Sequence, residues 1–215
     1  GFLFPNCMFS HDTIVPVSDL PRISVLIPLY RGKGTIKACL ESLIRQKGIE
    51  LQILLLDNGC PEKTGEWAGY FLGGLENPPE WLLFEEKANI GFAAAMNKLY
   101  EASDALWICF LNQDVELKQD HLEILVSALR GFGENKIGGV CGTLLRPSSG
   151  SNPAIIDTTG HEIFRDRIVR NRGAETALDG AGIPFEGGEV FGLSAACSVY
   201  SRDALEESRE PDGPF

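Results

Sequence analysis

Short apolar runs of strand length alternate with stretches of helical periodicity along the first 130 residues of the chain. The runs cover residues 23–28, 51–56, 81–84 and 106–111, and a stretch with apolar positions three or four residues apart follows each of them. Near-continuous apolar strands are typical of parallel sheets that helices cover on both faces. The alternation therefore predicts an α/β fold with a doubly wound, mostly parallel sheet.

The helices are predicted from their apolar faces and end signals. The first presents Ile36, Leu40 and Leu43 on one face before the stop signal at Gly48. Further helices are expected over residues 62–72, over residues 91–100 and after Asp120 as N-cap.

The second half of the chain has a different pattern. Beyond residue 137, short strand-like pieces at 139–145, 155–158, 189–191 and 195–200 are separated by Gly, Pro and Ser. The polar stretch 171–188 exceeds ordinary connection lengths, which predicts either a functional loop or disorder. We therefore expect an N-terminal arm over residues 1–22 and one domain over 23–215. Within this domain a β-rich, loop-rich half, 133–215, follows an α/β half, 23–132.

Charge and cysteine usage narrow the class of protein. The chain has 19 Lys and Arg against 30 Asp and Glu, a formal net charge of −11, so we expect no nucleic-acid partner. No apolar run approaches the roughly 18 residues that span a bilayer. Six widely spaced cysteines without a C-x-x-C pair, and no N-x-S/T acceptor, favour a cytoplasmic protein with free thiols.

The most informative residues come directly after the predicted strands. In an open parallel sheet, ligands bind outside the carboxyl ends of the strands. Asp57 directly follows the second predicted strand, and Asp114 comes shortly after the fourth. A carboxylate there suits a divalent cation that bridges substrate phosphates, although a turn residue before a helix explains the position equally well.

Other motifs in the sequence are incomplete. Gly32-Lys-Gly34, with Asp57 ending the next strand, imitates a dinucleotide-binding fingerprint, but Lys37 replaces the third glycine. Gly192-Leu-Ser194 imitates a nucleophile elbow, but no histidine follows it. The three histidines are isolated from one another, which predicts surface or capping roles and no metal ligation.

Four blocks together are more specific than any single motif. Residues 23–30, 54–59, 89–97 and 110–115, in this order and spacing, resemble family 2 glycosyltransferases of the GT-A (nucleotide-diphospho-sugar transferase) fold, and most of all their rhamnosyltransferase-like members. The resemblance extends from residue 23 to the end of the chain. It implies that residues 133–215 form the acceptor half of such an enzyme.

The resemblance also implies a binding site for a nucleotide-diphosphate sugar. The nucleoside would lie near the first two strand ends, and the diphosphate near the block 89–97, at a helix N-terminus. Residues 112–114 stand at the family's D-x-D metal motif without its first acid, so Mg²⁺ or Mn²⁺ is assigned to Asp114 alone. The implied nucleotide-sugar-binding residues are Pro28, Tyr30, Asp57, Asn58, Asn89, Gly91, Ala93, Asn97 and Asp114.

The implied reaction is inverting transfer, with dTDP-rhamnose as the first donor candidate, to a saccharide or lipid-linked acceptor at the inner face of the membrane, in bacterial surface polysaccharide synthesis. The general base of the family is expected beyond Phe215. The arginines of residues 165–172 either hold acceptor phosphates or form a solvated hairpin face. A sugar-nucleotide nucleotidyltransferase and a catalytically silent sugar-nucleotide-binding protein remain as alternatives.

Overall fold

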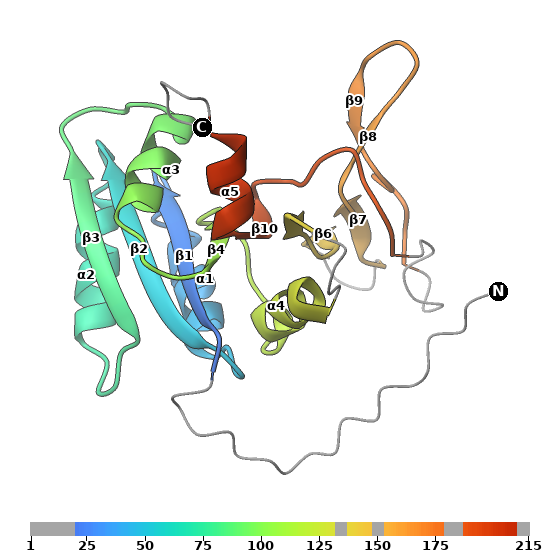
Figure 1. The fold of residues 1–215 in the computed structure, drawn as a ribbon. Helices are drawn as coiled ribbons and strands as arrows, with labels where there is room; N and C mark the ends of the chain where they lie inside the picture. Colours follow the sequence, from blue (N-terminus) through green and yellow to red (C-terminus); the bar gives the residue numbers. More distant parts are fainter. Residues whose placement is uncertain (1–19, 132–136, 148–152, 179–186, 210–215) are drawn as a thin grey trace.

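The computed structural model describes residues 20–131, 137–147, 153–178 and 187–209, which form a six-stranded central sheet with the strand order β3-β2-β1-β4-β10-β5 (Figure 1). Strands β1 to β4 run parallel to one another, which confirms the predicted doubly wound, mostly parallel sheet. The elements of the first half are β1 (Arg22–Leu29), α1 (Ile36–Ile44), β2 (Glu50–Asn58), α2 (Thr64–Gly73), β3 (Glu80–Glu86), α3 (Phe92–Glu101), β4 (Trp107–Leu111) and α4 (His121–Gly131).

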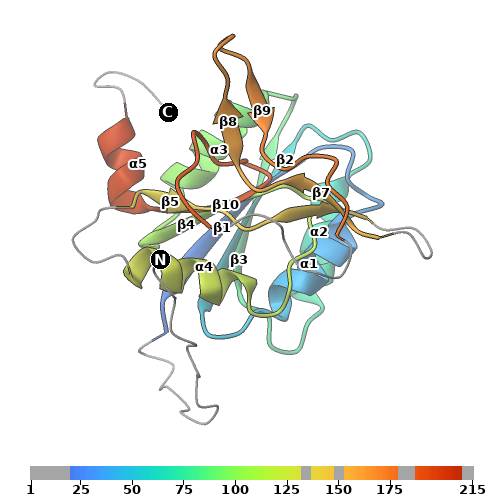
Figure 2. The same ribbon diagram turned by 90° about the vertical axis from the view of Figure 1, so that its right-hand side faces the viewer.

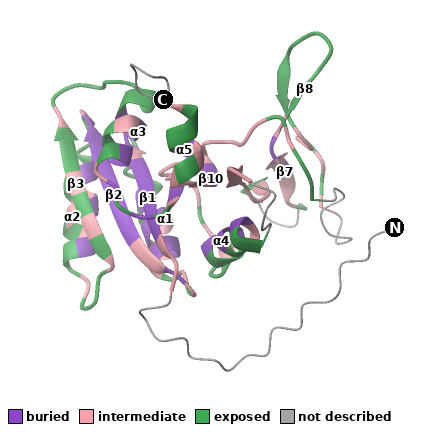
Figure 3. Cartoon of the chain, viewed as in Figure 1, coloured by how far each residue is buried: buried purple, intermediate pink, exposed green. Residues whose placement is uncertain are grey.

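The central strands β1 and β2 are buried on both faces, as their unbroken apolar sequences predict (Figure 3). Side chains alternate between two layers. Val25 and Ile27 pack into the cluster that α1, α2 and α4 cover, whereas Leu26 packs into the cluster on the opposite face, with α3. The helices therefore cover both faces of the sheet.

The second half adds short strands and one helix. Its elements are β5 (Gly139–Val140), β6 (Leu144–Arg146), β7 (Ile155–Thr158), β8 (His161–Ile163), β9 (Val169–Asn171), β10 (Cys197–Ser201) and α5 (Arg202–Ser208). β10 lies antiparallel between β4 and β5, and β8 and β9 form a hairpin that projects from the body of the molecule (Figure 2). This half is β-rich and loop-rich, as expected.

The second half differs from the sequence expectations in several details. The expected piece 139–145 forms two strands, β5 and β6, and the strands β8 and β9 were not among the expected pieces. Residues 189–191 do not form a strand, although the N–H of Phe191 donates to the carbonyl of His161 at 2.9 Å. The helix α5 was not expected, because Leu205 is its single buried side chain and leaves no apolar periodicity to read. The Ser201 hydroxyl caps this helix by accepting from the N–H of Ala204.

Several expectations fall outside the described residues. They concern most of the N-terminal arm, residues 179–186 of the polar stretch, and the end of the chain at 210–215. Among the described residues, no helix is both long enough and apolar enough to cross a membrane.

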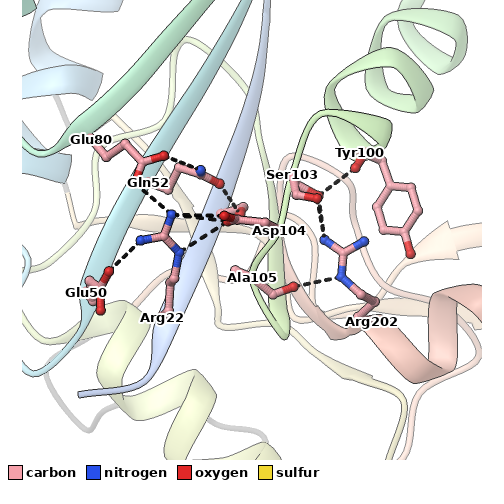
Figure 4. A network of polar contacts seen from close by, with 10 residues as sticks. Arg22, Glu50, Gln52, Glu80, Tyr100, Ser103, Asp104, Ala105 and Arg202 are labelled. Carbon is pink, nitrogen blue, oxygen red and sulfur yellow. Dashed lines mark hydrogen bonds and ion pairs between the residues drawn. The ribbon is translucent and has the colours of Figure 1, made fainter. Parts of the chain in front are cut away.

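Polar networks fix the edge of the sheet where the parallel strands begin (Figure 4). The Arg22 guanidinium pairs with Glu50 at 2.5 Å, with Glu80 at 2.7 Å and with Asp104 at 3.1 Å. Arg202 donates to the carbonyl of Ala105 at 2.8 Å and so ties α5 to the loop before β4. These contacts all lie at the amino edge of the sheet, opposite its carboxyl edge.

Candidate functional site

A cavity of about 300 Å³ opens at the carboxyl ends of β1, β2 and β4. This is the point at which the strand order reverses, where ligands bind in open α/β sheets. The lining residues are Pro28, Tyr30, Asn58, Asn89, Phe92, Asn112, Gln113 and Asp114. Five of the nine residues predicted from the sequence thus share one cavity: Pro28, Tyr30, Asn58, Asn89 and Asp114.

Gln113 joins the two strand ends on either side of the reversal. Its side-chain Nε2 donates to the carbonyl of Tyr30 at 2.6 Å, and its Oε1 accepts from the N–H of Tyr30 at 3.1 Å. Sequence reasoning did not assign this role, because it depends on β4 lying beside β1. The amide also explains Gly32, where an added Cβ would come within 2.1 Å of Oε1. Gly32 therefore makes room for a side chain, and the dinucleotide fingerprint is not needed to account for it.

Asn58 shapes the opposite wall of the cavity. Its Oδ1 accepts from the N–H of Ile90 at 2.8 Å, and its Nδ2 donates to the carbonyl of Gly91 at 3.2 Å and to Oδ1 of Asn89 at 3.3 Å. Gly91 has a φ of 88°, a conformation that favours glycine. Asn58 and Gly91 together set the entry into α3.

The N-terminus of α3 lies at the cavity. Gly91 is its N-cap and provides no side-chain hydrogen bond, while Phe92 lines the cavity. The first N–H groups of a helix have no partner within the helix and favour anions. Gly91, Ala93 and Asn97 do not line the cavity themselves. Gly91 and Ala93 belong to the first turn and can contribute through its backbone, whereas Asn97 lies beyond that turn of α3.

Asp57 does not line the cavity either. Its Oδ1 accepts from the N–H of Cys60 at 2.7 Å and its Oδ2 accepts from the N–H of Gly65 at 2.8 Å. A Cβ at Gly65 would come within 2.6 Å of this carboxylate. Asp57 is 9% exposed, and it holds the loop between β2 and α2.

Asp114 is the exposed carboxylate of the cavity, and it has no hydrogen-bond or ion-pair partner among the described residues. Asn112 beside it is held by its main chain, whose N–H donates to the carbonyl of Ala196 at 2.9 Å. The described residues contain no cluster of three or more His, Cys, Asp or Glu that could bind a metal. Magnesium is commonly held by one or two carboxylates plus substrate phosphates. The donor set therefore fits a divalent ion that binds together with a phosphorylated ligand.

None of the described cysteines lines the cavity, although the thiol of Cys39 donates to the carbonyl of Asn112 at 3.7 Å. Five cysteines are free in the described residues, and the sixth, Cys7, lies outside them. Burial raises the pKa of Cys39 to about 12, which keeps this thiol protonated. His121 is half-buried at the first position of α4, and its Nε2 lies 3.6 Å from Sγ of Cys197.

Comparisons with known proteins identify relatives of this arrangement. The profile of Glycosyl transferase family 2 matches residues 24–209. Glycosyltransferase AglE from Haloferax volcanii is 32% identical over 161 residues, which are 74% of this chain and 52% of that protein. The uncharacterized glycosyltransferase YibD from Escherichia coli is 31% identical over 106 residues, 49% of this chain and 30% of that protein. The chain thus spans about half the length of the first relative and less of the second.

Two solved structures share the fold. The mannosyltransferase PcManGT from Pyrobaculum calidifontis, in complex with GDP-Man and Mn²⁺, has a TM-score of 0.53 and 21% identity over 61% of this chain and 37% of that one. S. aureus TarS 1-349 has a TM-score of 0.53 and 17% identity over 87% of this chain and 48% of that one. At these identities the likeness establishes a GT-A-like fold. Because the profile match covers well over half of its residues, the chain belongs to glycosyl transferase family 2.

Proposed function

We propose that this chain carries the donor-binding part of a glycosyltransferase that transfers a sugar from a nucleoside diphosphate to a hydroxyl group. The observation that supports the proposal best is the composition of the cavity. The cavity is lined by Tyr30, by Phe92 at the first position of α3 and by the exposed carboxylate of Asp114. An aromatic surface, an anion-binding helix end and an acidic group together match a nucleoside, a diphosphate and a cation.

Electrostatics favours a cation between Asp114 and the diphosphate. Two negatively charged groups in a cavity of about 300 Å³ repel each other unless a positive charge lies between them. We infer Mg²⁺ or Mn²⁺, with Asp114 as its protein carboxylate. When bound, the ion would offset the charge that develops on the diphosphate as it leaves.

The nucleoside is proposed to lie against Pro28 and Tyr30. The main chain of Tyr30 is held in place, because Gln113 binds both its N–H and its carbonyl. Asp57, which was expected to contact the nucleoside, is proposed to act indirectly by holding the neighbouring loop. The donor nucleotide and sugar rest on the motif resemblance, with dTDP-rhamnose as the first candidate.

Titration calorimetry with dTDP, UDP and GDP, with and without Mn²⁺, tests the proposal. We expect one nucleotide to bind in a Mn²⁺-dependent manner and Asp114→Asn to weaken this binding at least about tenfold, the equivalent of roughly 1.4 kcal/mol. Glu116→Gln is the matched control, since Glu116 is an exposed acid two residues away that does not line the cavity. Full Mn²⁺-dependent binding by Asp114→Asn would contradict the assignment.

Turnover by the full-length protein separates the alternatives. A transferase releases nucleoside diphosphate only when a saccharide or lipid-linked acceptor is present. A nucleotidyltransferase forms or consumes pyrophosphate, and a silent binding protein does neither. We expect acceptor-dependent release and inversion at the sugar, with the protein acting on the cytoplasmic side of a membrane.

A further inference from the structure

We propose that the β8–β9 hairpin binds the surface of an anionic lipid bilayer. The hairpin joins His161–Ile163 to Val169–Asn171 and projects from the molecule in both views (Figures 1 and 2). The proposal goes beyond sugar transfer, and vesicle binding tests it without any enzymatic activity.

The turn of the hairpin is preformed. The N–H of Arg167 donates to the carbonyl of Phe164 at 2.8 Å, and the N–H of Phe164 donates to the carbonyl of Ile168 at 3.1 Å. Arg167 has a φ of 62°, as expected for a three-residue hairpin loop with a bulge. Asp166 accepts from the N–H of Ile168 at 3.0 Å and closes the turn. Little conformational entropy is therefore lost when the tip binds.

Apolar side chains are exposed on both faces of the hairpin. Ile163 and Val169 are cross-strand partners on one face, with 49% and 47% of their surface exposed. Phe164 and Ile168, at the next pair of positions, are 41% and 50% exposed. Phe164 lies on the other face, where the Arg170 guanidinium stacks on its ring at 4.6 Å. A groove on a protein partner would cover one face, whereas the bilayer interface surrounds an inserted tip and covers both.

The positive charge of the hairpin favours binding to an anionic surface. Residues 161–172 contain four arginines and two acids in a chain whose formal net charge is −11. Asp166 pairs with Arg170 at 3.2 Å and Glu162 with Arg172 at 3.8 Å.

The remaining two arginines, Arg165 and Arg167, have no ion pair among the described residues. Both lie in the turn, next to the apolar positions. Their long stems can extend along the inserted tip while the guanidinium groups reach lipid phosphates. The charge and the apolar surface of the hairpin are therefore complementary to the same interface.

The direction of the hairpin connects this surface to the cavity. β1 and β3 end at the top of the view in Figure 1, and the hairpin extends toward the same side in Figures 1 and 2. A hairpin held at the bilayer would thus place the cavity side toward the membrane.

Co-sedimentation with vesicles is the first test. We expect the chain to bind phosphatidylcholine vesicles that contain about 30% phosphatidylglycerol, and to stay in solution with pure phosphatidylcholine. Arg165→Gln with Arg167→Asn should weaken binding about 30-fold, because each arginine near an anionic surface contributes about fivefold. Asn suits the positive φ at Arg167. The matched control is Arg45→Gln with Lys47→Gln, two exposed cations after α1, which should bind as the wild type does.

The second test separates insertion from charge attraction. Ile168→Ser with Val169→Ser should weaken vesicle binding at least about tenfold, since each substitution removes apolar surface that would be buried in the bilayer. Leu106→Ser with Ile124→Ser is the control, because these side chains are 69% and 57% exposed elsewhere on the molecule. Circular dichroism should show all four variants folded.

Four outcomes would overturn the proposal. They are absence of binding to anionic vesicles, equal losses in the hairpin and control variants, unchanged binding of the serine variant, and full displacement by soluble glycerol phosphate. A concentration-dependent dimer that Ile168→Ser abolishes would instead assign the apolar tip to a second copy of the chain.

Discussion

The side chain of Gln113 and the main chain of Tyr30 exchange two hydrogen bonds, one in each direction. This pair ties the end of β4 to the end of β1 across the reversal in strand order. The same amide lies against Gly32, where an added Cβ would be 2.1 Å from Oε1. Gln113 therefore sets the spacing of the two loops that border the cavity.

Gly32→Ala should displace the Gln113 amide and lower the free energy of unfolding by about 1–3 kcal/mol, since the N–H and carbonyl of Tyr30 lose their partners. Gln113→Ala should cost a similar amount. The double variant should cost little more than either single one, because the three nearest atoms to the added Cβ all belong to Gln113. Urea denaturation measures these values. Gly34→Ala is the control, since nothing lies within 4 Å of its Cβ, and additive costs would contradict the coupling.

Asn58→Asp is expected to loosen the loop before α3. The carboxylate keeps an acceptor for the N–H of Ile90 but loses the donor to Gly91 and faces its carbonyl oxygen. We expect the unfolding free energy to fall by about 1–3 kcal/mol and the exchange of the Ile90 amide to speed up. Hydrogen exchange by NMR measures the second effect. Asn77→Asp, at an exposed position, should leave Ile90 exchange unchanged. Protection of Ile90 that survives in Asn58→Asp would contradict the role.

The sheet could be predicted from the sequence because its central strands are buried on both faces, which leaves apolar runs such as residues 51–56. The cavity could be located because parallel strands end at one edge. The antiparallel pairing of β10 with β4 could not be predicted from the sequence, since the residues of a short strand do not indicate which strand it pairs with. It also could not show Gln113 in contact with Tyr30, which are 83 residues apart and meet only through the strand order.

The orientation of the Asp57 side chain could not be predicted from the sequence either. An acid at a strand end can face the ligand or cap the loop that follows, and the same sequence is compatible with both orientations. Here backbone N–H groups occupy both carboxylate oxygens. Only the path of the loop from residue 57 to residue 65 decides between the two.

Asp57→Asn is therefore expected to act on stability first. The amide keeps one acceptor oxygen and turns its NH₂ group toward a backbone N–H, at Cys60 or at Gly65. We expect a loss of about 1–3 kcal/mol in urea denaturation. Asp114→Asn should change the unfolding free energy by less than about 0.5 kcal/mol, since its carboxylate is exposed. Unchanged stability of Asp57→Asn together with weaker nucleotide binding would restore a direct contact to the ligand.

The contribution of Tyr100, which links α3 to α5, to the free energy of unfolding should decrease at alkaline pH. Tyr100 is 2% exposed, and its hydroxyl donates to the Glu206 carboxylate at 2.5 Å. Burial, followed by this hydrogen bond, raises the pKa of Tyr100 to about 12. An unfolded tyrosine titrates near pH 10, so the folded state holds the proton more tightly. The stabilisation is fully present below about pH 10 and is lost as the pH rises toward 12.

Tyr100→Phe should lower the unfolding free energy by about 1 kcal/mol near pH 8, because the half-exposed Glu206 gives a hydrogen bond of modest strength. The difference from the wild type should shrink by about pH 11, where deprotonation destabilises only the tyrosine form. Urea denaturation at both pH values measures the two gaps. Tyr70→Phe is the control, since Tyr70 is 86% exposed and should give no gap at either pH. A gap for Tyr100→Phe that stays constant from pH 8 to pH 11 would show that the hydroxyl does not titrate in this range, and the link between α3 and α5 would then rest on packing alone.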